Sequence, residues 1–419
     1  MRRIEMIERR GGKYREEMKK KGNLNEDAVR QKFAQIANPR KTAKSCHEQK
    51  NFVFIKGMKI AGTTLLGIFD RFGVTRNLSF VLPQGHKLYL NWPFPLTKWD
   101  YRQNPQGFNI LVDHAIYTED VMSSIMPKDT IYITIIRHPM THLKSLVKYF
   151  EMPKLSGIPS SVENPVLEYF SDLPRYEAAY QRPGNKERYC IPDHFSMTRN
   201  LMSHCLGLPL GFPPGRKNVT GNAAEIQRHL RHLEDKFRLV MIADHFTESL
   251  VLLKRHMCWS FSDIVYSSAN VAFYKYKNWR APESFLEKHR QWSDADYQLF
   301  EHFNQTLWRK IEQEGEDFFA EVDAFRPVQG QVKEFCEGVY QHAKEKKPLP
   351  DALKVLVIPA SEWTREFSVT AKDCELLGPD PYVTQRRLQT ESDKLAKTSR
   401  GKLQILEPDP RQRYEKAVC

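Results

Sequence analysis

The residues with the clearest capacity for chemistry lie in the segment Gly57–Thr64, where two glycines at G-x4-G spacing enclose a lysine, Lys59. A glycine-bounded turn between a strand and a helix exposes backbone N–H groups at the positive end of the helix, which attracts anions. The ATPase version of such a loop continues with Lys and then Ser or Thr, whereas this chain has Thr63 and Thr64 there. The pattern therefore favours an anion site over a P-loop kinase or NTPase. A turn that binds nothing is the alternative at this point.

A second anion-binding pair lies further along the chain. Arg137 directly follows the apolar run 131–136, and Ser145 comes eight residues later. Open α/β sheets bind ligands at the carboxyl ends of their strands, and an arginine with a hydroxyl suits a phosphate group. We expect this pair to hold a second anionic group, with a surface ion pair as the alternative role for Arg137.

These residues need elements that bring them to one place. Short apolar runs followed by segments with helical periodicity predict strand–helix units, and their alternation predicts an α/β fold with a central parallel sheet flanked by helices. The expected units are a strand at 51–56 with a helix at 65–72 that ends at Gly73, a strand at 131–136 with a helix from Pro139 to about 150, and a strand at 239–243 with a helix over about 246–259. A further amphipathic helix is expected over about 295–313.

Two stretches rich in proline and aromatic residues, 80–108 and 151–195, are predicted to be long surface loops that shape the acceptor side of a site. Trp92, Trp99 and Tyr101 are candidates for stacking on a sugar. Aromatic residues that pack within the loops are the alternative.

Several collinear segments carry a resemblance to a known family. Residues 54–65 resemble the 5′-phosphosulfate loop of Golgi carbohydrate sulfotransferases, and 133–139 with Ser145 resemble their 3′-phosphate segment. Within that group the chain resembles the galactose-3-O-sulfotransferase family, which includes galactosylceramide sulfotransferase, over about 51–315. Further similar stretches are 108–114, 198–207, 239–259 and 303–308.

The resemblance implies a P-loop NTPase-like sulfotransferase fold and transfer of a sulfuryl group from 3′-phosphoadenosine 5′-phosphosulfate (PAPS) to a carbohydrate hydroxyl, most often the 3-OH of galactose in a glycolipid or a glycoprotein glycan. No metal is expected in this scheme, and no nucleic acid partner. The expected donor-binding residues are Lys56, Gly57, Lys59, Ala61, Gly62, Thr63, Thr64, Arg137 and Ser145. Lys59 and His114 are the expected catalytic residues, with His114 as general base.

The chain departs from the family at the loop. The family loop usually reads His-Lys-Thr, and here the histidine position is Met58 and the threonine position is Ile60. Because methionine cannot accept a proton, a non-catalytic relative that only binds is an alternative function. His138 stands where an acidic residue is common, and we interpret it as structural.

Composition limits the remaining possibilities. The net charge of +13 is concentrated in a polar leader, 1–50, which we expect to be a flexible, solvated arm, with contact to nucleic acid or an anionic membrane as the alternative. Residues 51–340 are expected to form the sulfotransferase domain and 341–419 a C-terminal extension partly packed on it. The seven cysteines have no zinc-site spacing, and their pairing is left open. No apolar run long enough for a transmembrane helix is visible, so a Golgi membrane location with a lumenal catalytic domain is implied by the resemblance alone.

Overall fold

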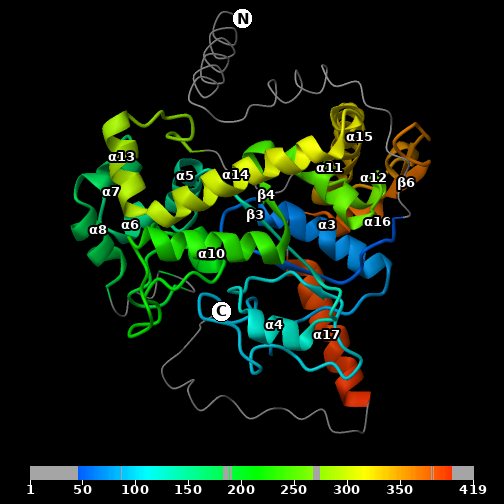
Figure 1. The fold of residues 1–419 in the computed structure, drawn as a ribbon. Coiled ribbons are helices and arrows are strands. Elements are labelled where there is room, and N and C mark those ends of the chain that lie inside the picture. Colours follow the sequence, from blue (N-terminus) through cyan, green and yellow to red (C-terminus); the bar gives the residue numbers. More distant parts are fainter. Residues whose placement is uncertain are drawn as a thin grey trace, which may run out of the picture.

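A parallel sheet of four strands lies at the centre of the computed structural model, which describes residues 46–85, 87–182, 188, 191–267, 274–378, 380 and 382–398 (Figure 1). The strand order is β2-β1-β3-β4. The strands are β1 (Phe52–Ile55), β2 (Ile110–Leu111), β3 (Ile131–Ile136) and β4 (Phe237–Ile242). Phe52 of β1 is in register with Ile110 of β2 and with Ile131 of β3. The expected α/β class and parallel sheet are confirmed.

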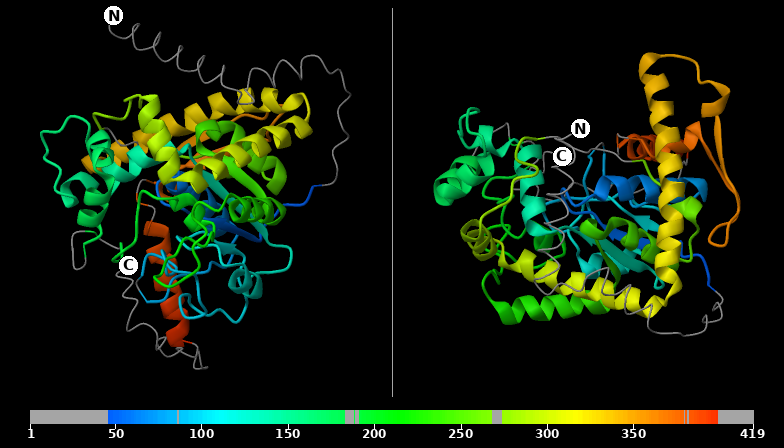
Figure 2. Two further views of the ribbon diagram at one scale, coloured as in Figure 1. Left: turned by 60° about the vertical axis from the view of Figure 1, so that its left-hand side comes forward. Right: turned by 90° about the horizontal axis from the view of Figure 1, so that it is seen from above.

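The strands form because their sequences are almost continuously apolar, as strands covered on both faces must be. All four residues of β1 are fully buried. Three of the described helices pack on β4: α10 (Ala223–Lys236), α11 (Phe246–Met257) and α14 (Asp294–Glu314). Further helices surround the sheet (Figures 1 and 2). The predicted strands at 51–56, 131–136 and 239–243 and the helix over about 295–313 are therefore confirmed.

Helix α3 (Gly62–Thr75) follows β1, and α5 (Pro139–Tyr149) follows β3 with Pro139 in its first turn. The prediction that Gly73 ends the first helix is wrong, because α3 continues to Thr75. Gly73 is needed for close packing instead. A Cβ added there would lie 2.3 Å from Cζ of Phe80 and 2.7 Å from Cδ1 of Ile110.

Over the residues that the structure describes, the two stretches predicted as long surface loops differ from that prediction: 151–195 contains helices, and 80–108 is a loop but is largely buried. Residues 151–195 contain α6 (Met152–Leu155), α7 (Pro165–Ser171) and α8 (Leu173–Tyr180), which build a second hydrophobic core against the inner face of α5. The stretch 80–108 has no helix or named strand, yet Leu90 and Trp92 are almost completely buried. Aromatic residues drove both stretches inward, because their large apolar area is costly to leave in water.

The remaining elements complete the periphery. They are α4 (Glu119–Ile125), α9 (Leu201–Cys205), η2 (Ala243–His245), α12 (Phe261–Ile264), α13 (Glu283–Trp292), α15 (Asp317–Glu345), η3 (Asp351–Leu353), β5 (Val355–Ile358), β6 (Phe367–Thr370), α16 (Ala371–Leu376) and α17 (Tyr382–Thr398). Strands β5 and β6 form a separate antiparallel pair. Helix α15 crosses residue 340, and α17 returns to lie beside the stretch 80–115 (Figures 1 and 2).

Two disulfides link separate segments of the described chain. Cys46 bonds to Cys258 after α11, and Cys336 of α15 bonds to Cys374 of α16. Most of the basic leader, 1–45, lies outside the described residues. Among the helices that the structure describes, none combines the length and hydropathy of a bilayer-spanning segment.

Candidate anion-binding site

The loop between β1 and α3 has an unusual backbone. Lys59 and Ala61 both have positive φ angles, 58° and 70°, and Ala61 is the residue before α3. Non-glycine residues in this region are uncommon, and such strain tends to occur at functional sites. A Cβ on Gly62 would meet Cγ of Lys56 at 3.0 Å, so glycine lets the Lys56 side chain pass directly beneath the helix start. This geometry is suited to an anion-binding turn.

Two buried histidines hold the loop from below. His114 donates from Nδ1–H to the carbonyl of Lys56 at 2.8 Å, and His142 of α5 donates from Nε2–H to the carbonyl of Met58 at 2.8 Å. A carbonyl can only accept, so these contacts fix the tautomer of each ring. Burial lowers the pKa of His142 to about 3 and that of His114 well below its usual value, so both rings are neutral. The two carbonyls are therefore occupied and cannot turn toward a bound anion.

The structure brings Lys59 and Arg137 together. Because β1 and β3 are parallel neighbours, the residues after each strand meet at one edge of the sheet. A guanidinium nitrogen of Arg137 lies 3.5 Å from the carbonyl oxygen of Lys59, and its Nε donates to Oγ1 of Thr141 at 3.0 Å. The pKa of Lys59 is lowered, first by burial and then by the Arg137 charge. Two adjacent cations are costly by themselves, and an anionic ligand would offset that cost.

Ser145 lies on α5, the helix that follows Arg137. Thr141, Ser145 and Tyr149 follow one another at intervals of four residues, which places them along one side of α5. Ser145 is partly exposed, and the Lys59 ammonium lies 4.0 Å from the centre of the Tyr149 ring. Sequence reasoning missed Tyr149, although its four-residue spacing from Ser145 was a usable signal.

Lys56 is the second lysine of the loop, and it is almost completely buried, with 2% of its surface exposed. Burial lowers its pKa to about 8, although the nearby Asp113 and Asp70 charges oppose that shift. Burial also raises the pKa of Asp113 to about 7 and that of Asp70 well above its usual value. In the part of the chain that the structure describes, no carboxylate is close enough to Lys56 to form an ion pair with it.

Other expected residues are placed as follows. Ala61 is exposed, Thr63 and Thr64 are partly exposed at the start of α3, and Gly57 is buried, where an added Cβ would meet Cδ1 of Ile60 at 3.0 Å. These positions surround the loop and are compatible with its amides facing a ligand.

His114 is beside the loop but is covered. Only 6% of its surface is exposed, and the Tyr89 ring packs edge-on against it with ring centres 4.8 Å apart. Its Nε2 carries the lone pair, because Nδ1 holds the proton. The arrangement makes His114 a support of the loop.

Two further expectations concern neighbouring side chains. Trp92 and Tyr101 are 1% and 4% exposed, so they pack within the protein and offer no face to a sugar, whereas Trp99 is partly exposed. His138 caps α5 by accepting from the Met140 N–H at 3.3 Å, which is a structural contact. Over the described ranges, no group of three or more His, Cys, Asp or Glu residues could hold a metal ion.

The chain is similar in sequence to known proteins. A family model described as Galactose-3-O-sulfotransferase matches residues 21–349. The chain is 32% identical to Galactose-3-O-sulfotransferase 2 of Homo sapiens over 269 residues, covering 63% of this chain and 62% of the relative. It is 31% identical to Galactose-3-O-sulfotransferase 3 of Mus musculus over 266 residues (62% and 57%) and 30% identical to Galactosylceramide sulfotransferase of Homo sapiens over 302 residues (70% and 66%). The chain thus spans less than two thirds of the length of each of these relatives.

Proposed function

Since the chain belongs to the galactose-3-O-sulfotransferase family, we propose that it transfers a sulfuryl group from PAPS to a carbohydrate hydroxyl, namely the 3-OH of galactose in a glycolipid or glycoprotein glycan. The observation that carries the proposal is the convergence of Lys59 and Arg137 at one edge of the sheet. An anionic donor with two charged ends would be held by Lys59, which follows β1, and by Arg137, which follows the neighbouring strand β3. PAPS supplies the sulfuryl group, and its 3′-phosphate distinguishes it from ATP.

The residues of the loop fit the phosphosulfate end of this donor. Lys56 is a buried cation without an ion-pair partner among the described residues, and it lies directly beneath Gly62 at the start of α3. We assign to Lys59 and the loop amides the role of offsetting the negative charge that grows on the leaving phosphate. Preorganised cations in a partly dry site do this without reorganising at the moment of reaction.

Arg137 and Ser145 fit the 3′-phosphate end. Arg137 presents a planar donor set that suits phosphate oxygens, and Thr141 orients it through the contact to Nε. Ser145 lies two turns further along α5 and adds a hydroxyl donor.

For the proton of the acceptor hydroxyl, His114 is our proposed base. It is neutral, as a base must be, and its Nε2 lone pair is left available by the contact of Nδ1 with Lys56.

The setting of the reaction follows from the family. We propose a P-loop NTPase-like sulfotransferase fold, supported by the G-x4-G loop between a central parallel strand and α3.

We also propose a Golgi membrane location with a lumenal catalytic domain. The disulfides Cys46–Cys258 and Cys336–Cys374 support it, because such bonds persist in oxidising compartments.

The test is transfer of labelled sulfate from PAPS to a panel of galactose-terminated acceptors, with mass spectrometry to locate the sulfate on the sugar. We expect Lys59→Ala and Arg137→Ala each to abolish transfer. Lys128→Ala is the control, because this exposed lysine lies before β3, at the opposite end of that strand from Arg137. Full activity in both site variants would refute the assigned roles.

A non-catalytic donor-binding protein is the second candidate. The observation in its favour is Met58, which is 4% exposed, offers no proton acceptor and is held through its carbonyl by His142. Binding of the nucleotide without turnover on any galactoside would establish this alternative.

A further inference from the structure

Helix α17, the last helix that the structure describes, lies beyond the family-matched residues 21–349, yet it packs against the site. Two glutamines on one side of α17 anchor it. Nε2 of Gln385 donates to the carbonyl of Leu88 at 3.1 Å, and Nε2 of Gln389 donates to the carbonyl of Lys87 at 3.0 Å. Both glutamines are buried, and Asp393 forms an ion pair with Arg102. The helix is thus fixed to the stretch of chain that leads into Tyr89.

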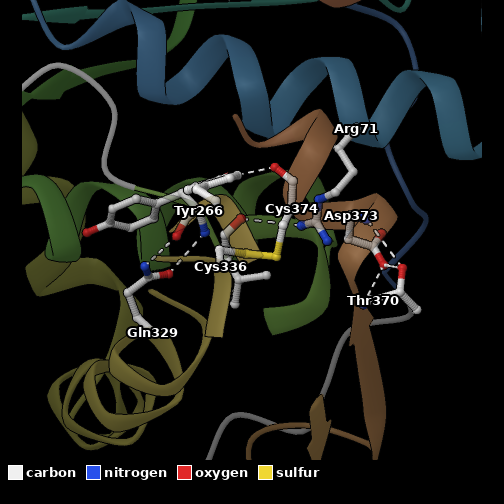
Figure 3. The surroundings of a disulfide bond; sticks show 9 residues. Arg71, Tyr266, Gln329, Cys336, Thr370, Asp373 and Cys374 are labelled. Atoms are coloured by element: carbon white, nitrogen blue, oxygen red, sulfur yellow. Dashed lines mark hydrogen bonds between the residues drawn. A yellow bond between two sulfur atoms is a disulfide. The ribbon is translucent and has the colours of Figure 1, made fainter. Parts of the chain in front are cut away.

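The segment before α17 is fixed as well. The disulfide Cys336–Cys374 joins α16 to α15 (Figure 3). The Tyr340 hydroxyl donates to the carbonyl of Cys374 at 2.6 Å. Thr370 and Asp373 cap the start of α16 reciprocally (Figure 3). Helix α16 then packs on α3, the helix that follows the anion loop. Helix α16, which precedes α17 in the chain, is therefore held against the helix that follows that loop.

The first residue of α17, Tyr382, contacts the buried lysine of the loop. The Lys56 ammonium lies 5.3 Å from the centre of the Tyr382 ring. Burial raises the pKa of Tyr382, and the adjacent Tyr89 side chain adds to the shift. Tyr89 in turn packs against His114, whose Nδ1 holds the Lys56 carbonyl. Lys56, Tyr382, Tyr89 and His114 thus form a ring of contacts in which each residue touches the next.

We propose that Tyr382 is a positioning residue for donor binding, which the C-terminal extension supplies by placing its ring against the Lys56 ammonium. The inference rests on the proposed function, since it assumes that Lys56 faces an anionic group of the donor. A buried ammonium on a flexible four-carbon chain has many positions, and an aromatic face restricts it while leaving its N–H donors available to a ligand. A carboxylate partner in the same place would compete with the donor for the charge.

The experiment compares full-length variants of Tyr382 by the KM for PAPS, by kcat, and by calorimetric binding of the product nucleotide 3′-phosphoadenosine 5′-phosphate. Tyr382→Leu removes the ring and is expected to raise the KM and the dissociation constant about tenfold, with kcat changed less than about twofold. Tyr382→Phe keeps the ring and should restore wild-type values. Val383→Ala, at an exposed neighbouring position on α17, is the control.

The outcomes separate the two claims. If the wild-type protein binds no nucleotide, the proposed function fails. If it binds and Tyr382→Leu binds equally well, only the role of Tyr382 is refuted. Equal losses in Tyr382→Phe and Tyr382→Leu would also refute it, because the ring would then not be the active feature. Should the leucine variant not fold, Tyr382→Met removes the ring with a flexible side chain of similar reach and is judged by the same criteria.

Discussion

Lys56 provides a prediction in which stability and binding change in opposite directions. The pKa of this fully buried lysine falls from 10.5 to about 8, and each unit corresponds to about 1.4 kcal/mol, so keeping the charge in the folded protein costs about 3 kcal/mol. Lys56→Met removes the charge while keeping most of the chain length. At pH 7 we expect the variant to gain up to about 3 kcal/mol in the free energy of unfolding and to bind the anionic nucleotide at least tenfold more weakly.

The pH dependence gives an independent measure of the same quantity. Between about pH 8 and 10.5 the folded wild-type protein loses the Lys56 proton while the unfolded chain still holds it, so stability rises with pH across this window. The methionine variant should lack that rise. Asp113, whose folded pKa is about 7, acts in a lower window, where stability falls as the pH rises from its unfolded value of 3.8 toward 7.

Urea unfolding at pH 7 and pH 9.5, together with calorimetric nucleotide titration, measures both effects. Lys128→Met, at an exposed lysine, is the matched control and should change stability by less than about 0.5 kcal/mol. A methionine variant that is less stable than the wild type by more than about 1 kcal/mol would refute the reasoning, because the Lys56 charge would then be stabilising.

Three further predictions concern other parts of the site and its support. Ser145→Ala should raise the KM for PAPS about fivefold with kcat unchanged, as expected for one hydrogen bond, and steady-state kinetics measure it. His114→Asn can still support the loop through its amide but cannot accept a proton, so single-turnover rates should fall about 10²-fold or more while nucleotide affinity is kept; an unchanged rate would remove His114 as the base. The double variant Cys336→Ser, Cys374→Ser removes a disulfide between cysteines 38 residues apart, and we expect the free energy of unfolding, measured by denaturation, to fall by about 4 kcal/mol. A fall of less than about 1 kcal/mol would show that this disulfide does not stabilise the fold.

The parts of the fold that sequence predicted best are those fixed by local pattern. The apolar run 131–136 coincides with β3, and Pro139 begins the following helix because its fixed φ and missing N–H suit that position. The approach of Lys59 to Arg137 was likewise predictable, because the ends of parallel strands share one edge of a sheet.

The parts that sequence could not predict depend on distant contacts. Glycine is common at helix ends, but Gly73 lies within α3 and is required because Phe80 and Ile110, from other segments, pack closely against it. The helices within 151–195 form because a second core needs them, and tertiary packing overrides weak local preference. Tyr382 lies 326 residues after Lys56, and no local pattern marks it as part of the site.

The measurement that tests the central claim most directly is calorimetric titration of the wild-type protein and Arg137→Ala with 3′-phosphoadenosine 5′-phosphate and with AMP, which differs from it only in lacking the 3′-phosphate. If one site on the sheet edge holds both ends of the nucleotide, the wild type will prefer the 3′-phosphorylated ligand by about 10²-fold, and the variant will bind both ligands with equal, weak affinity. Equal affinity of the wild type for the two nucleotides, or an undiminished preference in the variant, would contradict the account.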